Sequence, residues 1–260
     1  MTATPCAAAN RSVRHGTCFR RRLSTHHAGA APHSAVAELG VVSRLSTRLM
    51  KIHDEAENIR AKLHEQQSVT VRIALFGQPG AGKSSLINTI TGKKLATEGV
   101  KTDQTIEAKA YDWEGLHLVD LPGYGTQRFP KESYFTTFDI YSFDVFLCVF
   151  DGKFRDADSQ FFHELTSIGK VCLFVRNKTD NLWEDGKTVA ELQQEVAADL
   201  ESHIKSAQPL FFTSCKTRRG IDALSQAIVR CLNNAKRDRY LRAAKAYSED
   251  FLNAKKKSLR

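Results

Sequence analysis

The apolar positions of this chain follow two periods, and the order of the two periods predicts its architecture. Short apolar runs of strand length recur at 70–76, 106–112, 115–120, 143–150, 171–176 and 209–213. Segments with apolar residues every three or four positions predict helices from Lys83 and near 134–139, 157–168, 188–206 and 219–234. Strands and helices that alternate in this way form a mainly parallel sheet with helices on both faces. We therefore expect one α/β domain over residues 69–234.

A long amphipathic helix is predicted ahead of this domain, over residues 37–68. Its apolar residues follow alternating steps of three and four, and charged residues fill most of the other positions. The seam consists of Val42, Leu45, Leu49, Ile52, Ala56, Ile59 and Leu63. A seam this narrow is typical of a coiled coil. A helix that lies against its own domain is an equally good interpretation.

The chain beyond residue 234 continues the helical pattern on a different face. A step of five residues separates Ala235, the end of one apolar stripe, from Tyr240, the start of the next. The second stripe consists of Tyr240, Ala244, Tyr247, Phe251 and Ala254. We predict a basic amphipathic helix over 235–260 whose seam packs on the N-terminal helix. The two terminal helices would then form a small helical annex beside the α/β domain.

The positive charge of the chain lies at its two ends. The net charge is +9, of which residues 1–37 carry +5 and residues 235–260 carry +6, so the segment between them carries −2. Nucleic-acid binding by the central domain is therefore not favoured. The basic helix is compatible with contacts to RNA phosphates or to an anionic membrane, with Tyr240, Tyr247 and Phe251 inserted. A solvated helix packed on the annex is the third interpretation.

Residues 1–36 contain no acidic residue and are rich in Ala, Ser, Arg and His. This composition resembles an organellar transit peptide. A disordered tail, or an upstream extension of a protein that starts at Met50, are the alternatives. We expect a cytoplasmic protein, peripheral to a membrane if the basic helix binds lipid, with a mitochondrion or another organelle as the alternative location. Cysteines without paired spacing indicate a reducing compartment.

Five segments of the α/β domain have the order and spacing of a guanine-nucleotide pocket. They are residues 77–84 (GQPGAGKS), Thr105, 120–123 (DLPG), 177–180 (NKTD) and 214–216 (SCK). Any one of them could occur by chance. The ordered set meets the chemical needs of phosphate, metal and base, so we expect GTP and Mg²⁺ as ligands.

The glycine-rich segment is predicted to cradle the phosphates. Its glycines let backbone amides approach a phosphate chain, and the helix that follows adds its positive N-terminal end. Lys83 is expected to contact the β- and γ-phosphates, and Ser84 to ligate Mg²⁺. The predicted nucleotide contacts of this segment are Gln78, Pro79, Gly80, Ala81, Gly82, Lys83, Ser84 and Ser85.

Further residues complete the predicted metal and γ-phosphate site. Asp120 ends an alternating strand, where its carboxylate would face the metal, and Gly123 would offer its amide to the γ-phosphate. Thr105 would close over Mg²⁺ and the γ-phosphate only in the triphosphate state, and Thr102 is its competitor. The predicted metal ligands are Ser84, Thr105 and Asp120, and Thr105 and Gly123 are the predicted catalytic residues.

Two later segments are predicted to bind the base. Asp180 would accept hydrogen bonds from N1–H and the 2-amino group of guanine, which adenine does not offer on that edge. Asn177 would brace the loop, and the stem of Lys178 would lie over the ring. A backbone amide of the third segment would bind the guanine O6, and its candidate residues are Ser214, Cys215 and Lys216.

These motifs resemble those of translation-factor-related GTPases. The stronger likeness is to the immunity-related (interferon-inducible) GTPases and covers about 70–185. It lies in 120–126 (DLPGYGT), 129–131 (FPK), Tyr134, 141–144 (YSFD), 153–155 (KFR) and 174–178 (FVRNK). The segment 118–125 (LVDLPGYG) also resembles the ribosome-assembly GTPases of the Era-like group. Either resemblance implies the G domain of a P-loop GTPase.

The chain also departs from these families. The immunity-related type usually has a longer C-terminal helical domain, and often another residue at Asn177. Ras-like proteins have a glutamine that orients the attacking water where this chain has Tyr124. Some Era-like relatives hold potassium with an asparagine where this chain has Gly80. Catalysis is therefore expected to depend on a partner, on self-association, or on Gln127 or Arg128, and intrinsic hydrolysis to be slow.

The patterns together indicate a GTP-hydrolysing conformational switch or self-assembling GTPase. Its loops 94–105 and 121–136 would rearrange with the γ-phosphate. The alternatives are an organellar or bacterial ribosome-assembly GTPase that binds RNA, and a non-hydrolysing GTP-binding scaffold. We expect GTP and GDP as ligands and a homodimer formed through the G domain or the helical annex. Peripheral membrane contact is a further option, and RNA is the least favoured partner.

Overall fold

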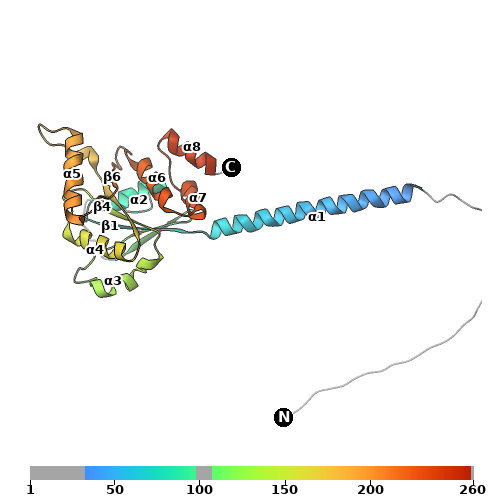
Figure 1. Cartoon of the computed structure of the whole chain (residues 1–260), viewed down its shortest axis with the longest axis horizontal. Coiled ribbons are helices and arrows are strands. Elements are labelled where there is room, and N and C mark those ends of the chain that lie inside the picture. The colour runs from blue at the N-terminus through green and yellow to red at the C-terminus, as the bar shows by residue number, and fades with distance from the viewer. Residues whose placement is uncertain (1–32, 98–106, 259–260) are drawn as a thin grey trace, which may run out of the picture. The chain divides into compact units, whose positions relative to one another are not determined.

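The computed structural model describes residues 33–97 and 107–258 (Figure 1). These residues form a six-stranded sheet in the order β2-β3-β1-β4-β5-β6. The strands are β1 (Val71–Gly77), β2 (Lys109–Trp113), β3 (Leu116–Asp120), β4 (Val145–Phe150), β5 (Val171–Arg176) and β6 (Leu210–Phe212). β2 runs antiparallel to β3, and the other neighbouring pairs are parallel. The mainly parallel sheet predicted from the apolar runs is confirmed.

Helices cover both faces of the sheet. The helices are α1 (His33–Ser68), α2 (Lys83–Thr91), α3 (Lys131–Thr137), α4 (Asp156–Ser167), α5 (Val189–Ile204), α6 (Ile221–Cys231), α7 (Asn234–Ala243) and α8 (Glu249–Ser258). Short 3-10 turns lie at Ile140–Ser142 and Thr179–Asn181. No helix among the described residues is both long enough and apolar enough to cross a bilayer.

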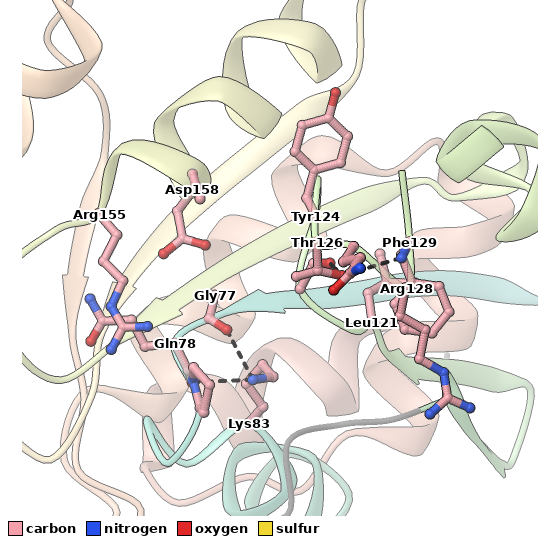
Figure 2. A pocket seen from close by; sticks show the side chains of 14 residues that line it. Gly77, Gln78, Lys83, Leu121, Tyr124, Thr126, Arg128, Phe129, Arg155 and Asp158 are labelled. Atoms are coloured by element: carbon pink, nitrogen blue, oxygen red, sulfur yellow. Dashed lines mark hydrogen bonds between the residues drawn. The ribbon is translucent and has the colours of Figure 1, made fainter. Parts of the chain in front are cut away.

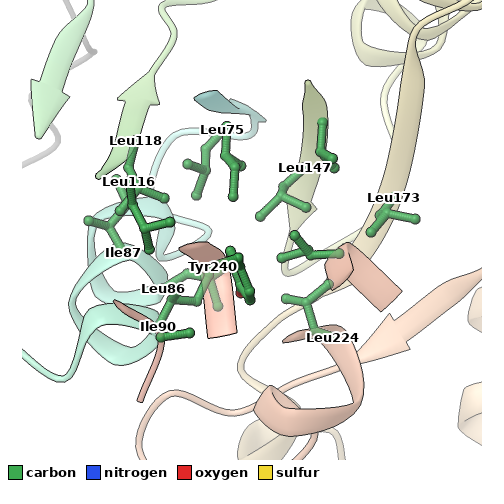
Figure 3. Close-up of a cluster of buried hydrophobic side chains, with 14 of the residues drawn as sticks. Leu75, Leu86, Ile87, Ile90, Leu116, Leu118, Leu147, Leu173, Leu224 and Tyr240 are labelled. Atoms are coloured by element: carbon green, nitrogen blue, oxygen red, sulfur yellow. The ribbon is translucent and has the colours of Figure 1, made fainter. Parts of the chain in front are cut away.

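Two clusters of buried side chains lie on the two faces of the sheet, because successive side chains of a strand point to opposite sides. Ile73 and Leu75 of β1 belong to the first cluster, together with residues of α2, α6, α7 and α8. Figure 3 shows Leu75 and the other strand leucines of this cluster facing α2, α6 and Tyr240. Ala74 and Phe76 belong to the second cluster, with residues of α3, α4 and α5. The alternation within β1 therefore separates the helices into two layers.

The prediction of one C-terminal helix that pairs with the N-terminal helix is wrong. Helix α6 ends at Cys231, and α7 begins at Asn234. The residue before it, Asn233, caps α7, because its side chain accepts a hydrogen bond from the amide of Lys236, at 3.0 Å. Tyr240 and Phe251 are fully buried in the first cluster, against the sheet. The step of five in the apolar pattern marks a turn of the chain, which returns the second stripe to the same core. Buried in this way, these two rings are not available for insertion into a membrane.

Helix α1 exposes the seam that its sequence predicts. The chain divides within this helix into two compact units, Met1–Ala56 and Glu57–Arg260. Coiled-coil pairing of the seam therefore stays a prediction, and the transit-like residues 1–32 lie outside the described ranges. The described apolar residues of the seam that are more than half exposed are Leu45, Leu49, Ile52 and Ile59.

Candidate functional site

The glycine-rich segment joins the C-terminal end of β1 to the N-terminus of α2, and two of its glycines have no room for a side chain. Gly77 has a φ of 116° and Gly82 a φ of 90°, both in the region that favours glycine. A Cβ on Gly77 would collide with the carbonyl oxygen of Val149, and one on Gly82 with the side-chain amide of Asn177. The loop thus passes close to β4 and to the 177–180 segment, which brings two of the sequence motifs together.

Lys83 is buried at the centre of this loop. Its Nζ donates hydrogen bonds to the carbonyl oxygens of Gly77, at 3.1 Å, and Gln78, at 3.2 Å (Figure 2). The same nitrogen lies 3.8 Å from Oδ1 of Asp120, which is too long for a hydrogen bond. An ammonium held by two carbonyls keeps a third proton to donate, so Lys83 is ready for an anionic ligand.

Asp120 lies at the C-terminal end of β3 and is 4% exposed. Its Oδ1 has no hydrogen-bond partner among the described residues. Burial raises the pKa of this carboxyl, while Lys83 and Lys109 act in the opposite direction. A buried carboxylate oxygen without a partner is costly, and Mg²⁺ prefers oxygen ligands. Asp120 therefore fits a metal ion, together with Ser84 in the first turn of α2.

A cavity of about 760 Å³ opens beside Lys83, between the glycine-rich loop, the loop after Asp120 and the start of α4 (Figure 2). Gly123, the predicted γ-phosphate contact, is on its wall, and so are both candidate catalytic side chains, Gln127 and Arg128. The other predicted nucleotide residues on the wall are Gln78, Pro79 and Lys83. Thr105 and Thr102 lie outside the described residues.

The sequence analysis missed Asp158, which also lines this cavity. It lies in the first turn of α4, and its Oδ2 is buried without a hydrogen-bond partner in the part of the chain that the structure describes. Burial raises the pKa of Asp158 to about 6, although Arg155 and Lys83 lower it. An acidic residue in a first turn is common because it favours the helix dipole. Its sequence position therefore gave no sign of a role in the site.

Tyr124 occupies the position at which a water-orienting glutamine is found in Ras-like proteins, and its ring is buried. It stacks on Phe161 with ring centroids 4.7 Å apart and meets Tyr134 edge-on at 5.1 Å. In Figure 2 the ring points away from Lys83. The Tyr134 hydroxyl donates to the carbonyl of Pro122, at 2.6 Å. Aromatic packing thus anchors the loop after Asp120, and Tyr124 offers no group to an attacking water.

A second cavity, of about 430 Å³, lies beside the 177–180 segment. Asn177 is 1% exposed and donates from Nδ2 to the carbonyl of Ala81, at 2.9 Å, while its Oδ1 accepts from the Thr213 hydroxyl, at 3.1 Å. One side chain therefore ties the base-side loops to the phosphate loop. The cavity is lined by Gly82, Ser85, Thr89, Asn177, Lys178, Asp180, Asn181, Cys215 and Lys216.

The structure revises the role expected of Ser214. Its backbone amide donates to the carbonyl of Arg219, at 3.0 Å, so this amide is not available to a guanine O6. The Ser214 hydroxyl instead donates to Oδ1 of Asp180, at 2.6 Å, and orients that carboxylate. The Lys178 ammonium pairs with Asp151 at 2.6 Å, a partner that the sequence analysis did not identify. Cys215 or Lys216 remains to supply the amide.

The glycine-rich loop, Asp120 and the 177–180 segment thus follow strands of one mainly parallel sheet. Residues 40–260 match the family model described as "Interferon-inducible GTPase (IIGP)". The chain belongs to the interferon-inducible GTPase family. The match covers the whole sheet and the C-terminal helices α7 and α8, which the motif resemblance did not reach.

Curated relatives share parts of the chain. Interferon-gamma-inducible GTPase 10 of Mus musculus is 31% identical over 137 residues, which are 50% of this chain and 33% of that protein. Interferon-inducible GTPase 1 of Mus musculus is 30% identical over 150 residues, 54% of this chain and 36% of that protein. GTPase Der of Persephonella marina is 24% identical over 218 residues, 78% of this chain and 48% of that protein. The chain thus matches about a third to a half of the length of these relatives.

Solved structures are more distant. Aquifex aeolicus Era bound to GDP·AlF4⁻ is 22% identical, with a TM-score of 0.48 over 64% of this chain and 57% of that chain. A probable GTP-binding protein engB is 24% identical, with a TM-score of 0.45 over 62% of this chain and 98% of that chain. The fold assignment rests on the sheet order and the glycine-rich loop rather than on these likenesses.

Proposed function

We propose that the chain binds GTP with Mg²⁺ and hydrolyses it to GDP and phosphate, as a slow conformational switch. The observation that carries the proposal is the pairing of a phosphate loop with a buried, unpartnered Asp120 oxygen 3.8 Å from Lys83. Membership of the interferon-inducible GTPase family supports the same chemistry. The two separate cavities, one beside Lys83 and one beside Asp180, support separate phosphate and base pockets.

The phosphate end would act by charge and position. Lys83 would donate its remaining proton to the β- and γ-phosphates, and the amides at the start of α2 would add hydrogen bonds. Ser84 and Asp120 would hold the metal ion, which when bound neutralises charge that develops on the phosphates. Gly123 is exposed and would offer its amide to the γ-phosphate.

The base end would select guanine. Asp180 is exposed at the second cavity, and the Ser214 hydroxyl occupies its Oδ1 from one side. Its remaining acceptor positions would take the N1–H and 2-amino donors of guanine. Adenine would offer no donor to these remaining positions, and sites built on such hydrogen bonds discriminate by roughly 10⁴-fold.

The loop after Asp120 would be the moving part of the switch. It is fixed at one end by the Tyr134 hydroxyl on Pro122 and by the buried ring of Tyr124, whereas Gly123 and Thr126 are exposed. A loop held in this way can re-aim the Gly123 amide without disturbing the core. The other loop predicted to rearrange, 94–105, contains Thr105 and lies mostly outside the described residues.

Binding of a fluorescent GTP analogue tests the proposal. Lys83→Ala should weaken GTP binding roughly 10- to 100-fold, because hydrogen bonds to charged groups are among the strongest. Lys256→Ala, which changes an exposed lysine in the last turn of α8, is the matched control and should bind as the wild type does. ATP bound as tightly as GTP, or undiminished affinity in Lys83→Ala, would overturn the proposal.

The burial of Tyr124 supports a second element of the proposal, namely that catalysis is completed by self-association. Single-turnover hydrolysis measured at increasing protein concentration should accelerate per molecule. Arg128→Ala and Gln127→Ala test whether either side chain of this loop contributes to the hydrolysis rate. If neither variant is slower, the missing group comes from elsewhere on a second copy of the chain. Fast hydrolysis with a rate per molecule that does not depend on protein concentration would contradict this element.

A further inference from the structure

The link between α7 and α8, residues 244–248, contacts the helix that follows the phosphate loop. The amide of Lys245 donates to the carbonyl of Ile90, at 2.8 Å. The hydroxyl of Tyr247 donates to the carbonyl of Thr89, also at 2.8 Å. Thr89 lines the base-side cavity, and its own hydroxyl bonds the carbonyl of Ser85, another wall residue, at 2.7 Å. The link thus fixes one wall of that cavity.

The same tyrosine contacts the turn and the helix that follow the opposite wall of the cavity. The guanidinium of Arg218 lies 5.2 Å from the centroid of the Tyr247 ring, and Arg218 belongs to the turn that follows the cavity residues Cys215 and Lys216. The Tyr247 amide donates to both carboxylate oxygens of Asp222, in the first turn of α6, at 3.1 and 3.0 Å. Tyr247 is therefore a bridge between α2 and the loop predicted to bind the guanine O6.

Both helices that flank the link are anchored in the core. Tyr240 of α7 and Phe251 of α8 are fully buried in the core. The ammonium of Lys255 crosses the link and donates to the carbonyls of Arg242, at 3.2 Å, and Ala244, at 2.5 Å. Burial raises the pKa of Tyr247, so its hydroxyl keeps the proton that it donates.

We propose that Tyr247 is a positioning residue for the base-side cavity and that the α7–α8 link sets the rate of nucleotide release. This inference rests on the proposed function. In this proposal, release requires the walls formed by α2 and by the 214–216 loop to separate. Tyr247 bonds α2 directly and contacts Arg218, in the turn that continues from the second wall. A partner protein that displaced residues 244–248 would release the α2 wall of the base-side cavity without contacting the nucleotide. The link is thus a place at which exchange of GDP for GTP is regulated.

The release rate of a fluorescent GDP analogue, chased with unlabelled GDP, tests the inference. Tyr247→Phe removes only the hydroxyl that bonds Thr89, and release should accelerate about 3- to 10-fold, the equivalent of one hydrogen bond. Arg218→Asn removes the guanidinium from the ring and should act in the same direction. Asn tolerates the positive φ of 62° found at Arg218.

Tyr240→Phe is the matched control. It removes the hydroxyl of a fully buried tyrosine in α7, close to the link, and that hydroxyl donates to Ser225 at 3.2 Å. Tyr240 does not line the base-side cavity. Thermal unfolding of all variants measures the loss of stability that a purely structural role would cause. The expected result is fast release in the Tyr247 and Arg218 variants and unchanged release in Tyr240→Phe.

Two results would overturn the inference. One is a wild-type release rate in Tyr247→Phe, and the other is an equal acceleration in Tyr240→Phe, because both would assign the tyrosine to general stability. A wild-type protein that binds no guanine nucleotide would instead contradict the proposed function. The two failures are distinguishable because the first leaves nucleotide binding intact.

Discussion

At the scale of single residues, the end of the site near Lys83 contains two buried carboxyl groups that are not fully hydrogen-bonded. Asp120 and Asp158 each have a buried oxygen without a hydrogen-bond partner among the described residues. Burial raises the pKa of both carboxyls. Such groups cost stability in the folded protein and are retained at sites that bind a ligand. The two carboxyls differ in their neighbours, since only Asp120 has Lys83 within ion-pair distance.

Asp158→Asn should stabilise the protein at neutral pH. The pKa of this carboxyl rises from 3.8 to about 6 on folding, so the native state binds more protons than the unfolded state between these values. Stability therefore falls as the pH rises through this window, and the loss persists above it. We expect a gain of about 3 kcal/mol at pH 7.5 and about half of that at pH 5, measured by urea unfolding.

Asp156→Asn is the control for that measurement. Its side chain lies in the same helical turn but is 92% exposed, so its ionised form has no burial cost to remove. A gain in Asp158→Asn that is the same at both pH values would show that charge is not the cause.

Asp180→Asn should change the preferred base. The carboxylate that would accept from guanine becomes an amide that presents donors, so GTP affinity should fall by roughly 10²- to 10⁴-fold. Xanthosine triphosphate, which has a carbonyl in place of the 2-amino group, should bind the variant more tightly than it binds the wild type. Competition of both nucleotides against a fluorescent analogue measures the change, and equal affinities in wild type and variant would contradict it.

At the scale of elements, the buried strands were the most predictable part of the chain. The run predicted at 171–176 is β5 itself, and the run at 143–150 contains β4. Strands buried on both faces are continuous apolar runs, which the sequence displays directly. The C-terminal helices were not predicted correctly, because a step of five in an apolar stripe does not distinguish a shifted helix from a turn. Asn233 was the available signal, as a preferred N-cap residue.

The site was predictable to a similar degree. In the glycine-rich loop and the 177–180 segment, the residue types of one short stretch are enough to indicate the expected contacts. The positions of Lys83 and Asn177 in the site could therefore be predicted from the sequence. Asp158 and Tyr247 could not, because their positions in the site depend on how distant helices pack. The amide of Ser214 was misassigned for the same reason, since Arg219 occupies it through a turn.

Asn233→Ala tests the start of α7. The side chain caps the helix by accepting from the amide of Lys236, so its loss should lower the free energy of unfolding by about 0.5–2 kcal/mol. Asn253→Ala is the control, because Asn253 is exposed inside α8, where alanine is the better helix former. Urea unfolding of both variants measures the difference. An equal response of the two asparagines would rule out the cap.

At the scale of the whole molecule, the last helices complete the core rather than flank it. Tyr240, Ala244 and Phe251 are fully buried in the same core cluster as Val71 and Ile73 of β1. Lys236 pairs with Asp144 at 2.5 Å, and Asp144 also accepts from the amide of Arg72 in β1. The domain is therefore closed by contacts between the two ends of residues 71–258.

Phe251→Ala should destabilise the whole domain. The ring is fully buried in the first cluster, and phenylalanine-to-alanine changes in cores lower the free energy of unfolding by about 3–5 kcal/mol. Leu252→Ala is the adjacent control, because Leu252 is 43% exposed and should cost far less. Thermal unfolding followed together with release of bound nucleotide should show a single coincident loss. A Phe251→Ala variant that unfolds α8 alone would contradict the shared core.

Phe251 belongs to the same core cluster as Val71 of β1, and the distance between them in the sequence sets a timetable for synthesis. About 180 residues separate Val71 from Phe251, and a ribosome adds roughly 5 to 20 residues per second. The apolar side of the first strand therefore waits roughly 9 to 36 s for its last covering ring. During that interval the apolar surface of the sheet is only partly covered, so the nascent chain is prone to aggregate. A chaperone that binds this surface would raise the yield of folded protein.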